Sequence, residues 1–117
     1  MNVPHPLSDA LVEQIAQRFR ILGDPTRIKI LDRLRDGQAS AAELIELLAT
    51  SQQNVSKHLA ILSGAGIVGR SKSDGVTHYR IVDESVMAMC EHVCGALARQ
   101  VEQLSEALGG ALSGARR

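Results

Sequence analysis

The sequence predicts a mainly α-helical fold with one small β-hairpin, and three observations support this class. Apolar residues recur at helical spacing in four successive segments that precede residue 64. An Asp-Gly pair, Asp74-Gly75, separates two runs rich in β-formers, residues 67–71 and 76–82, which is typical of a hairpin. A last segment, from about 84 to 108, has the apolar period of one long helix. The 117 residues suffice for one ordinary domain.

Two helices are expected first. Ser8 is a suitable N-cap, and Gly23 ends the helix that follows. The apolar residues of this first helix are Leu11, Ile15, Phe19 and Leu22. The Asp24-Pro25 pair opens the second helix, because Asp is a good cap and Pro fits the first helical position. Its apolar stripe is predicted to be Ile28, Leu31 and Leu34, and Gly37 follows its end.

Two shorter helices follow, joined by a tight turn. Ser40 caps the third helix, and Thr50 interrupts it. Ser51 caps a fourth helix, which Gly64 and Gly66 stop. The predicted inward face of this fourth helix is Val55, Leu59 and Leu62. Two short capped helices that lead into a hairpin form the outline of a winged helix-turn-helix, in which the second short helix enters the DNA major groove.

Four runs of the sequence resemble segments of the ArsR/SmtB family of metal- and stress-sensing repressors. They are LGDPTRI at 22–28, SQQNVSKHL at 51–59, LSGAGIV at 62–68, and the wing residues Asp74-Gly75 with His78-Tyr79-Arg80. The resemblance covers roughly residues 8–108. It implies a homodimeric repressor that leaves its operator DNA when an inducer binds.

The polar face of the fourth helix is the predicted DNA reader. Side chains near its N-terminus that point away from the inward face are Gln53, Asn54, Ser56 and Lys57. Gln and Asn can pair with adenine, Lys with guanine or phosphate, and Ser with phosphate. The resemblance adds Gln52 as a phosphate contact. Near the hairpin tip, the expected backbone or minor-groove contacts are Arg70, Lys72 and Ser73. His58, beside the apolar face, is expected to pack or to hydrogen-bond, and a base contact is the alternative.

The charge distribution agrees with a DNA-binding centre. The whole chain carries 13 basic and 13 acidic residues, for a formal net charge of zero. Residues 51–80 nevertheless carry four basic groups against one acidic group, whereas residues 81–108 carry one basic group against five acidic groups. The basic segment coincides with the predicted reader and wing, so the zero net charge does not argue against DNA.

The last helix is predicted to form a dimer interface. Its apolar stripe consists of Val86, Cys90, Val93, Leu97, Val101, Leu104 and Leu108. A stripe of this length on a small domain indicates burial against a second subunit, and packing within one chain is the alternative. The resemblance implies that the first helix joins this interface. A two-fold dimer would place two reader helices about one DNA turn apart.

Cys90 and Cys94 lie one turn apart on the last helix, and three interpretations of them remain open. They are small buried residues, ligands of a soft metal ion or metalloid inducer, or a redox or persulfide switch. A metal site would use Asp83, Cys90 and Cys94, completed by His5 of the arm or by a partner chain. No other cofactor is indicated. The chain departs from the family's common zinc pattern, because Ser85 stands where a histidine is usual.

Composition and motifs limit the remaining functions. We divide the chain into an extended arm (1–7), a folded domain (8–108) and a flexible tail (109–117), with no membrane span or secretion leader, so a cytoplasmic location is expected. One Phe, one Tyr and no Trp disfavour a binder that stacks bases on aromatic side chains. No catalytic order, phosphate loop or Cys-x-x-Cys indicates an enzyme. The alternative to a repressor is a protein-interaction or constitutive regulatory module of the same fold with structural cysteines.

Overall fold

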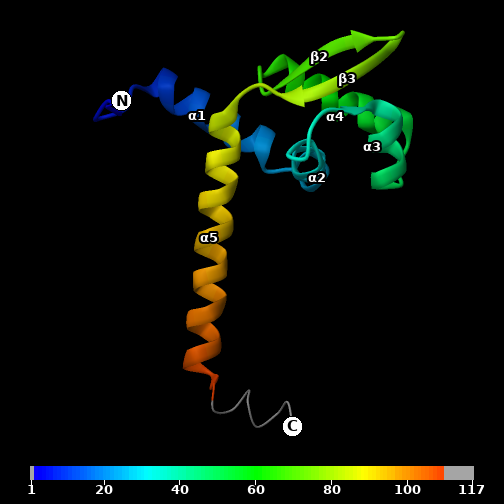
Figure 1. Ribbon diagram of the computed structural model, residues 1–117. Helices are drawn as coiled ribbons and strands as arrows, with labels where there is room; N and C mark the ends of the chain where they lie inside the picture. Colours follow the sequence, from blue (N-terminus) through cyan, green and yellow to red (C-terminus); the bar gives the residue numbers. More distant parts are fainter. Residues whose placement is uncertain (1, 110–117) are drawn as a thin grey trace. The chain divides into compact units, whose positions relative to one another are not determined.

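A computed structural model describes residues 2–109 (Figure 1). The chain divides into two compact units, residues 1–83 and 84–117. The elements of the first unit are α1 (Asp9–Leu22), α2 (Pro25–Leu34), β1 (Ala39–Ser40), α3 (Ala41–Leu48), α4 (Gln52–Gly64), β2 (Val68–Ser73) and β3 (Val76–Ile81). The second unit contains α5 (Glu84–Ala107). This order confirms the predicted winged helix-turn-helix. Apart from Gly109, the predicted tail lies outside the described residues.

The hairpin belongs to a three-stranded antiparallel sheet with the order β1-β3-β2. Asp74 and Gly75 form its two-residue turn with φ values of 53° and 77°, as the Asp-Gly pair predicts, because a type I′ turn needs two positive φ angles. Strand β1 was not predicted, since its two residues carry no strand signal of their own. It forms because Ala39 and Ser40 pair with Tyr79 and His78 of β3.

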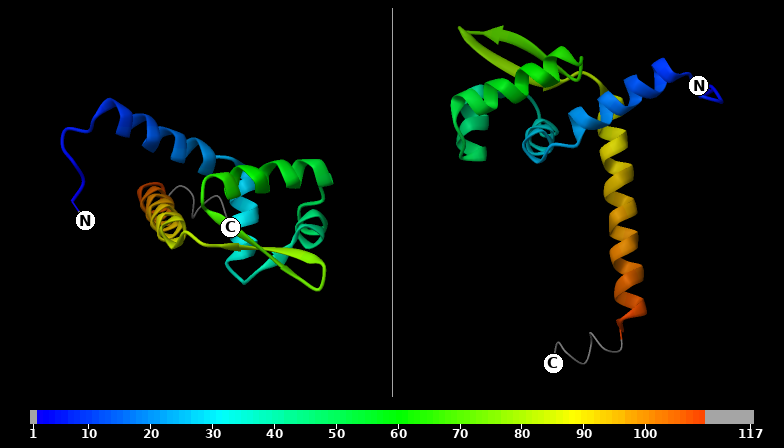
Figure 2. Two further views of the ribbon diagram at one scale, coloured as in Figure 1. Left: turned by 90° about the horizontal axis from the view of Figure 1, so that it is seen from above. Right: turned by 180° about the vertical axis from the view of Figure 1, so that it is seen from behind.

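The core of the first unit lies where α2, α3, α4 and the sheet meet (Figure 2). Its largest fully buried side chains include Ile30, Leu44, Val55, Leu59, Leu62 and Ile67. The predicted inward face of α4 is therefore confirmed. The predicted stripe of α2 is wrong at one position, because Ile28 is 49% exposed whereas Ile30 is fully buried. Ile28 lies three residues before Leu31 and Ile30 lies four residues before Leu34, so helical spacing alone did not separate them.

Side-chain caps fix where the helices begin, and all four predicted caps are confirmed. The Ser8, Ser40 and Ser51 hydroxyls accept backbone N–H groups three residues ahead at 3.1–3.2 Å. Asp24 Oδ1 accepts the N–H groups of Thr26 and Arg27 at 2.9 and 3.1 Å. At α3 the cap is a reciprocal capping box, because Glu43 Oε1 also accepts the Ser40 N–H at 3.2 Å. Each short helix therefore has a defined first turn.

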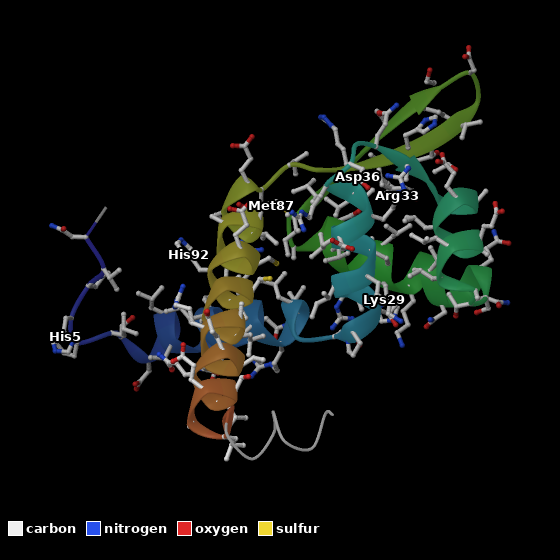
Figure 3. The ribbon with its side chains drawn as sticks, turned by 60° about the horizontal axis from the view of Figure 1, so that its bottom comes forward. His5, Lys29, Arg33, Asp36, Met87 and His92 are labelled. Atoms are coloured by element: carbon white, nitrogen blue, oxygen red, sulfur yellow. The ribbon has the colours of Figure 1, made fainter. Side chains whose placement is uncertain are left out.

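Replacing Asp24 by alanine is expected to lower the free energy of unfolding by about 1 kcal/mol, because two N–H groups of α2 lose their acceptor. The Arg27 N–H, which bonds the carboxylate, lowers the pKa of Asp24 below its ordinary value of 3.8. The cap therefore stabilises the fold above that pH and is lost as the pH falls through the lowered pKa. Urea unfolding should show the difference at neutral pH and its disappearance in acid. Asp36→Ala, on an exposed residue just past α2 (Figure 3), is the matched control, and an equal loss there would contradict the cap assignment.

Helix α5 has 24 residues and presents most of its apolar stripe to solvent. Val93, Leu97, Val101 and Leu104 are each more than half exposed. Among the described residues, no helix combines the length and apolarity needed to cross a membrane.

Candidate nucleic-acid interface

The turn between α3 and α4 is short and held by local hydrogen bonds. Ala49 ends α3 in the left-handed region with φ 50°, and Thr50 and Ser51 complete the turn. Ser51 caps α4, and Asn54 Nδ2 donates to Thr50 Oγ1 at 3.1 Å. The first turn of α4 is thus bound to the turn that precedes it. This geometry fixes the direction in which α4 leaves α3, as a helix-turn-helix requires.

The predicted reader residues of α4 do not all have the same environment. Gln52, Gln53, Ser56 and Lys57 are exposed, on the part of α4 that the core leaves uncovered. Asn54 is half-buried, and its amide already donates to Thr50. A two-bond contact with adenine uses both the amide and the carbonyl of an asparagine. The exposed set therefore offers free polar groups to a ligand, whereas Asn54 first stabilises the turn.

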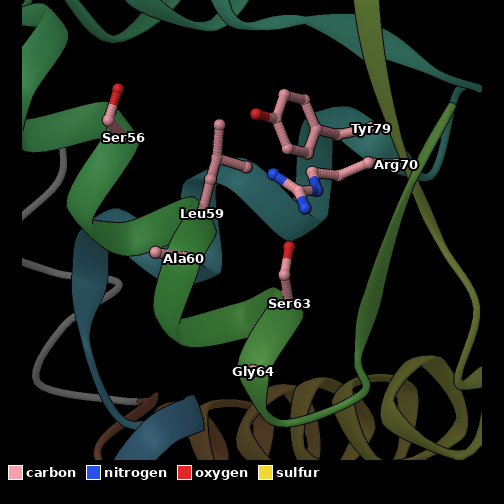
Figure 4. Close-up of a pocket in the computed structure, with 7 residues that line it drawn as sticks. All are labelled: Ser56, Leu59, Ala60, Ser63, Gly64, Arg70 and Tyr79. Atoms are coloured by element: carbon pink, nitrogen blue, oxygen red, sulfur yellow. The ribbon is translucent and has the colours of Figure 1, made fainter. Parts of the chain in front are cut away.

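A cleft of about 500 Å³ lies between α4 and the hairpin (Figure 4). The residues that line it are Ser56, Leu59, Ala60, Ser63, Gly64, Arg70 and Tyr79. Arg70 and Tyr79 are cross-strand partners, and the Arg70 guanidinium points from the hairpin toward Ser63 of α4. The Ser63 hydroxyl is buried and has no hydrogen-bond partner within the described residues. The cleft is thus lined by the Arg70 guanidinium, by serine and tyrosine hydroxyls, and by the apolar side chains of Leu59 and Ala60.

The structure places the three predicted wing residues differently. Ser73 pairs with Val76 and directly precedes the turn, and Lys72 is the next residue back. Both are exposed. Arg70 lies four residues before Asp74 of the turn and lines the cleft, so it lies farther from the hairpin tip than Lys72 and Ser73. Cross-strand pairing, which fixes which face of the hairpin each side chain occupies, decides this position.

His58 is buried beneath the exposed face of α4 and hydrogen-bonded, as the sequence predicted. Its Nδ1 lies 2.9 Å from Nη1 of Arg27, which is always a donor, so Nδ1 acts as the acceptor of a neutral ring. Burial is the main cause of the lowered pKa of His58, which agrees with a neutral ring. Arg27 also donates to backbone carbonyls at the end of α1. The role of Arg27 could not be predicted from the sequence, because a contact across 31 residues leaves no local pattern.

The three predicted metal ligands have different surroundings. Asp83 forms an ion pair with Arg18 at 3.6 Å. Cys90 is half-buried and Cys94 is exposed, and both thiols are free. Within residues 2–109, no group of three or more His, Cys, Asp or Glu side chains is arranged to hold a metal ion.

Comparison with known proteins identifies the class of the chain. A helix-turn-helix domain family matches residues 22–69, from the end of α1 into β2. The HTH-type transcriptional regulator KmtR of Mycobacterium tuberculosis is 40% identical over 84 residues, which are 71% of this chain and only 64% of KmtR. The HTH-type transcriptional regulator CmtR of Mycobacterium bovis is 34% identical over 90 residues, which are 76% of each chain.

Solved structures agree with this class. The crystal structure of Rv0081 from M. tuberculosis is 27% identical and has a TM-score of 0.76, covering 82% of this chain and 97% of that one. The expectation that the chain is not an enzyme is confirmed, because the relatives it matches are transcriptional regulators. By its motifs, its fold and these relatives, the chain belongs to the ArsR/SmtB family of winged helix-turn-helix transcriptional repressors.

Proposed function

We propose that the chain is a homodimeric, cytoplasmic repressor that binds operator DNA with α4 and the hairpin. The observation that carries this proposal is the exposed polar face at the start of α4, formed by Gln53, Ser56 and Lys57. This face lies directly after a capped turn, where helix-turn-helix proteins contact base edges. In this arrangement Gln53 and Lys57 contact bases, and Ser56 contacts phosphate.

The remaining predicted contacts complete the interface. Gln52 reaches phosphate, and Asn54 contributes mainly by holding the turn against Thr50. Lys72 and Ser73 approach the DNA backbone from the hairpin tip, whereas Arg70 approaches it from the cleft. Residues 51–80 carry an excess of three positive charges, so the affinity should fall as salt rises.

A second copy of the chain is proposed to cover the apolar stripe of α5. Leu97 and Val101 are 55% and 67% exposed, and Val93 and Leu104 extend the same face of the helix. A contiguous exposed apolar surface is typical of an interface. Phe19 of α1 is 59% exposed and offers further apolar area. A dimer would supply two α4 helices for two half-sites of one operator.

The function is tested by selecting duplexes from a random-sequence library with the wild-type protein and titrating the selected duplex. The proposal predicts one enriched motif with two related halves and an affinity that falls steeply with salt. Absence of any enriched duplex at low salt, together with co-purification of a partner protein, would favour the protein-interaction module instead.

Cys90 and Cys94 are proposed to receive the inducer, because two free thiols lie one turn apart and one of them is exposed. The inducer is a thiol-binding metal ion or a thiol-reactive compound. A metal ion would need further ligands from the partner chain, with Asp83 first leaving Arg18.

Arsenite or a soft metal ion is expected to release DNA from the wild-type protein, whereas Cys90→Ala and Cys94→Ala proteins should keep it bound. The DNA titration is repeated with Zn²⁺, Ni²⁺, Cu(I), arsenite, a persulfide donor and peroxide. His92→Ala is the matched control, since His92 lies midway between Cys90 and Cys94 in the sequence but on another face of α5. Retention of DNA by the wild-type protein in every arm would make the cysteines structural and the regulator constitutive.

A further inference from the structure

The Arg27 guanidinium connects α1, α2 and α4 behind the reader face, which is the exposed face of α4 formed by Gln53, Ser56 and Lys57. Arg27 lies in the first turn of α2, and its backbone N–H is held by the Asp24 cap at 3.1 Å. Its Nε donates to the carbonyl of Ile21 at 2.6 Å and its Nη2 to the carbonyl of Arg20 at 3.3 Å, both in the last turn of α1. Its Nη1 donates to His58 Nδ1 of α4 at 2.9 Å. Each guanidinium nitrogen therefore has a different partner.

This arrangement fixes the guanidinium and, through it, α4. The guanidinium is planar and rigid, so three simultaneous bonds set both its position and its orientation. His58 is 5% exposed and follows Lys57 directly. Successive residues of a helix move together, so a shift or rotation at His58 displaces Lys57 and Gln53 as well. Base contacts tolerate little displacement, since bidentate hydrogen bonds require defined distances and angles.

We propose that Arg27 is a positioning residue for DNA recognition: by bonding the last turn of α1 and His58 of α4, it holds the reader face in the orientation that contacts bases. This inference rests on the proposed function, because it assigns a role within the same DNA interface. Arg27 itself does not contact DNA in this arrangement. Its effect passes through His58, which is buried and makes no base contact.

The proposal is tested with two pairs of variants in titrations of the selected duplex. Arg27→Gln removes the charge and the planar guanidinium. Arg27→Lys retains the charge and most of the aliphatic side chain but also lacks the guanidinium. His58→Phe removes the acceptor, whereas His58→Asn places an amide oxygen where Nδ1 stood. Arg33→Gln is the matched control, because this α2 arginine bonds the Gly37 carbonyl and Glu43 rather than α4.

Arg27→Gln and His58→Phe are expected to weaken DNA binding about tenfold, the effect of losing one hydrogen bond to a charged group. His58→Asn should recover most of the wild-type affinity, and Arg33→Gln should match the wild type. The slope of affinity against salt should remain that of the wild type in every Arg27 variant, since no phosphate contact is lost. Lys72→Ala, in contrast, should reduce that slope, because Lys72 is proposed to contact the DNA backbone.

The pH dependence gives a readout that general destabilisation would not mimic. The charged groups that act on His58 are Asp24, whose Oδ1 is 3.9 Å from Nδ1, and the cations Arg27 and Lys57. Protonation of Nδ1 removes the acceptor and places two cations together, so it opposes the bond to Arg27. Burial lowers the pKa of His58 below its ordinary value of 6.5. The hydrogen bond from Arg27 to His58 is therefore present above pH 6.5 and is lost as the pH falls through the lowered pKa. Wild-type affinity should therefore fall in acid relative to that of His58→Asn.

The possible outcomes separate this inference from the function on which it rests. If the wild-type protein selects no duplex, the proposed function is wrong. If it binds DNA and Arg27→Gln, Arg27→Lys and His58→Phe bind equally well, the positioning role is wrong. A reduced salt slope in Arg27→Gln, which loses the charge, would also overturn it, by making Arg27 a phosphate contact. Thermal unfolding of each variant identifies any that do not fold, and His58→Asn and Arg27→Lys then decide the test.

Discussion

Lys57→Ala is expected to raise the dissociation constant for operator DNA by at least about thirtyfold, and Gln53→Ala is expected to do the same. Both side chains are exposed near the start of α4 and face away from its buried residues. A good base contact contributes about 1–3 kcal/mol to discrimination, and each substitution occurs twice in the proposed dimer. Titration of the selected duplex by fluorescence anisotropy measures the loss.

The controls for this prediction come from the same unit of the chain. Lys29 of α2 and Gln14 of α1 are exposed residues of the same types, so Lys29→Ala and Gln14→Ala remove equal charge and amide groups elsewhere. They should bind DNA as the wild type does. Sedimentation should show that all four variants keep the wild-type mass. Wild-type affinity in both Lys57→Ala and Gln53→Ala would refute the assignment of α4 as the reader.

Leu97→Asp is expected to separate the proposed dimer and to abolish operator binding as a consequence. Leu97 is 55% exposed at the middle of the α5 stripe, where a second copy would cover it. A carboxylate buried against apolar side chains costs several kcal/mol, and a two-fold interface contains the substitution twice. The dimer dissociation constant should rise more than about a hundredfold, as measured by sedimentation equilibrium.

Gln103→Asp is the control for the dimer prediction, because Gln103 is exposed on a different face of α5. It should leave both the mass and the DNA affinity unchanged. A wild-type protein with the mass of one chain, or a Leu97→Asp protein that keeps the wild-type mass, would contradict the proposed interface. Circular dichroism verifies that both variants retain their helices.

The free thiols and the ion pair of Asp83 bear on how much of the proposed inducer site could be predicted. Helical spacing alone placed Cys90 and Cys94 one turn apart, and α5 forms as predicted. It did not indicate that Asp83 pairs with Arg18, a residue 65 positions earlier. A ligand set that combines α5 with other segments depends on contacts between distant residues, and local spacing carries no information about them.

The sequence by itself determined the elements of this protein and where they begin. Ser8, Asp24, Ser40 and Ser51 cap their helices through bonds to residues two or three positions ahead, and the Asp-Gly turn forms within one hairpin. The two faces of α4 were also predictable from the sequence. Val55 and Leu59 lie on the buried face, and Gln53 and Lys57 lie on the exposed face. These features depend on neighbours along the chain, so residue type and period suffice to predict them.

Only the tertiary structure decided which of the remaining side chains meet. It buried Ile30 rather than Ile28, paired Ala39 with Tyr79, and placed Arg70 in the cleft beside α4. It also brought Arg27 to His58, across 31 residues. Each of these outcomes is a contact between elements, and its geometry depends on how helices and strands pack together. Helical and strand periods limit such contacts to one face but do not select the partner.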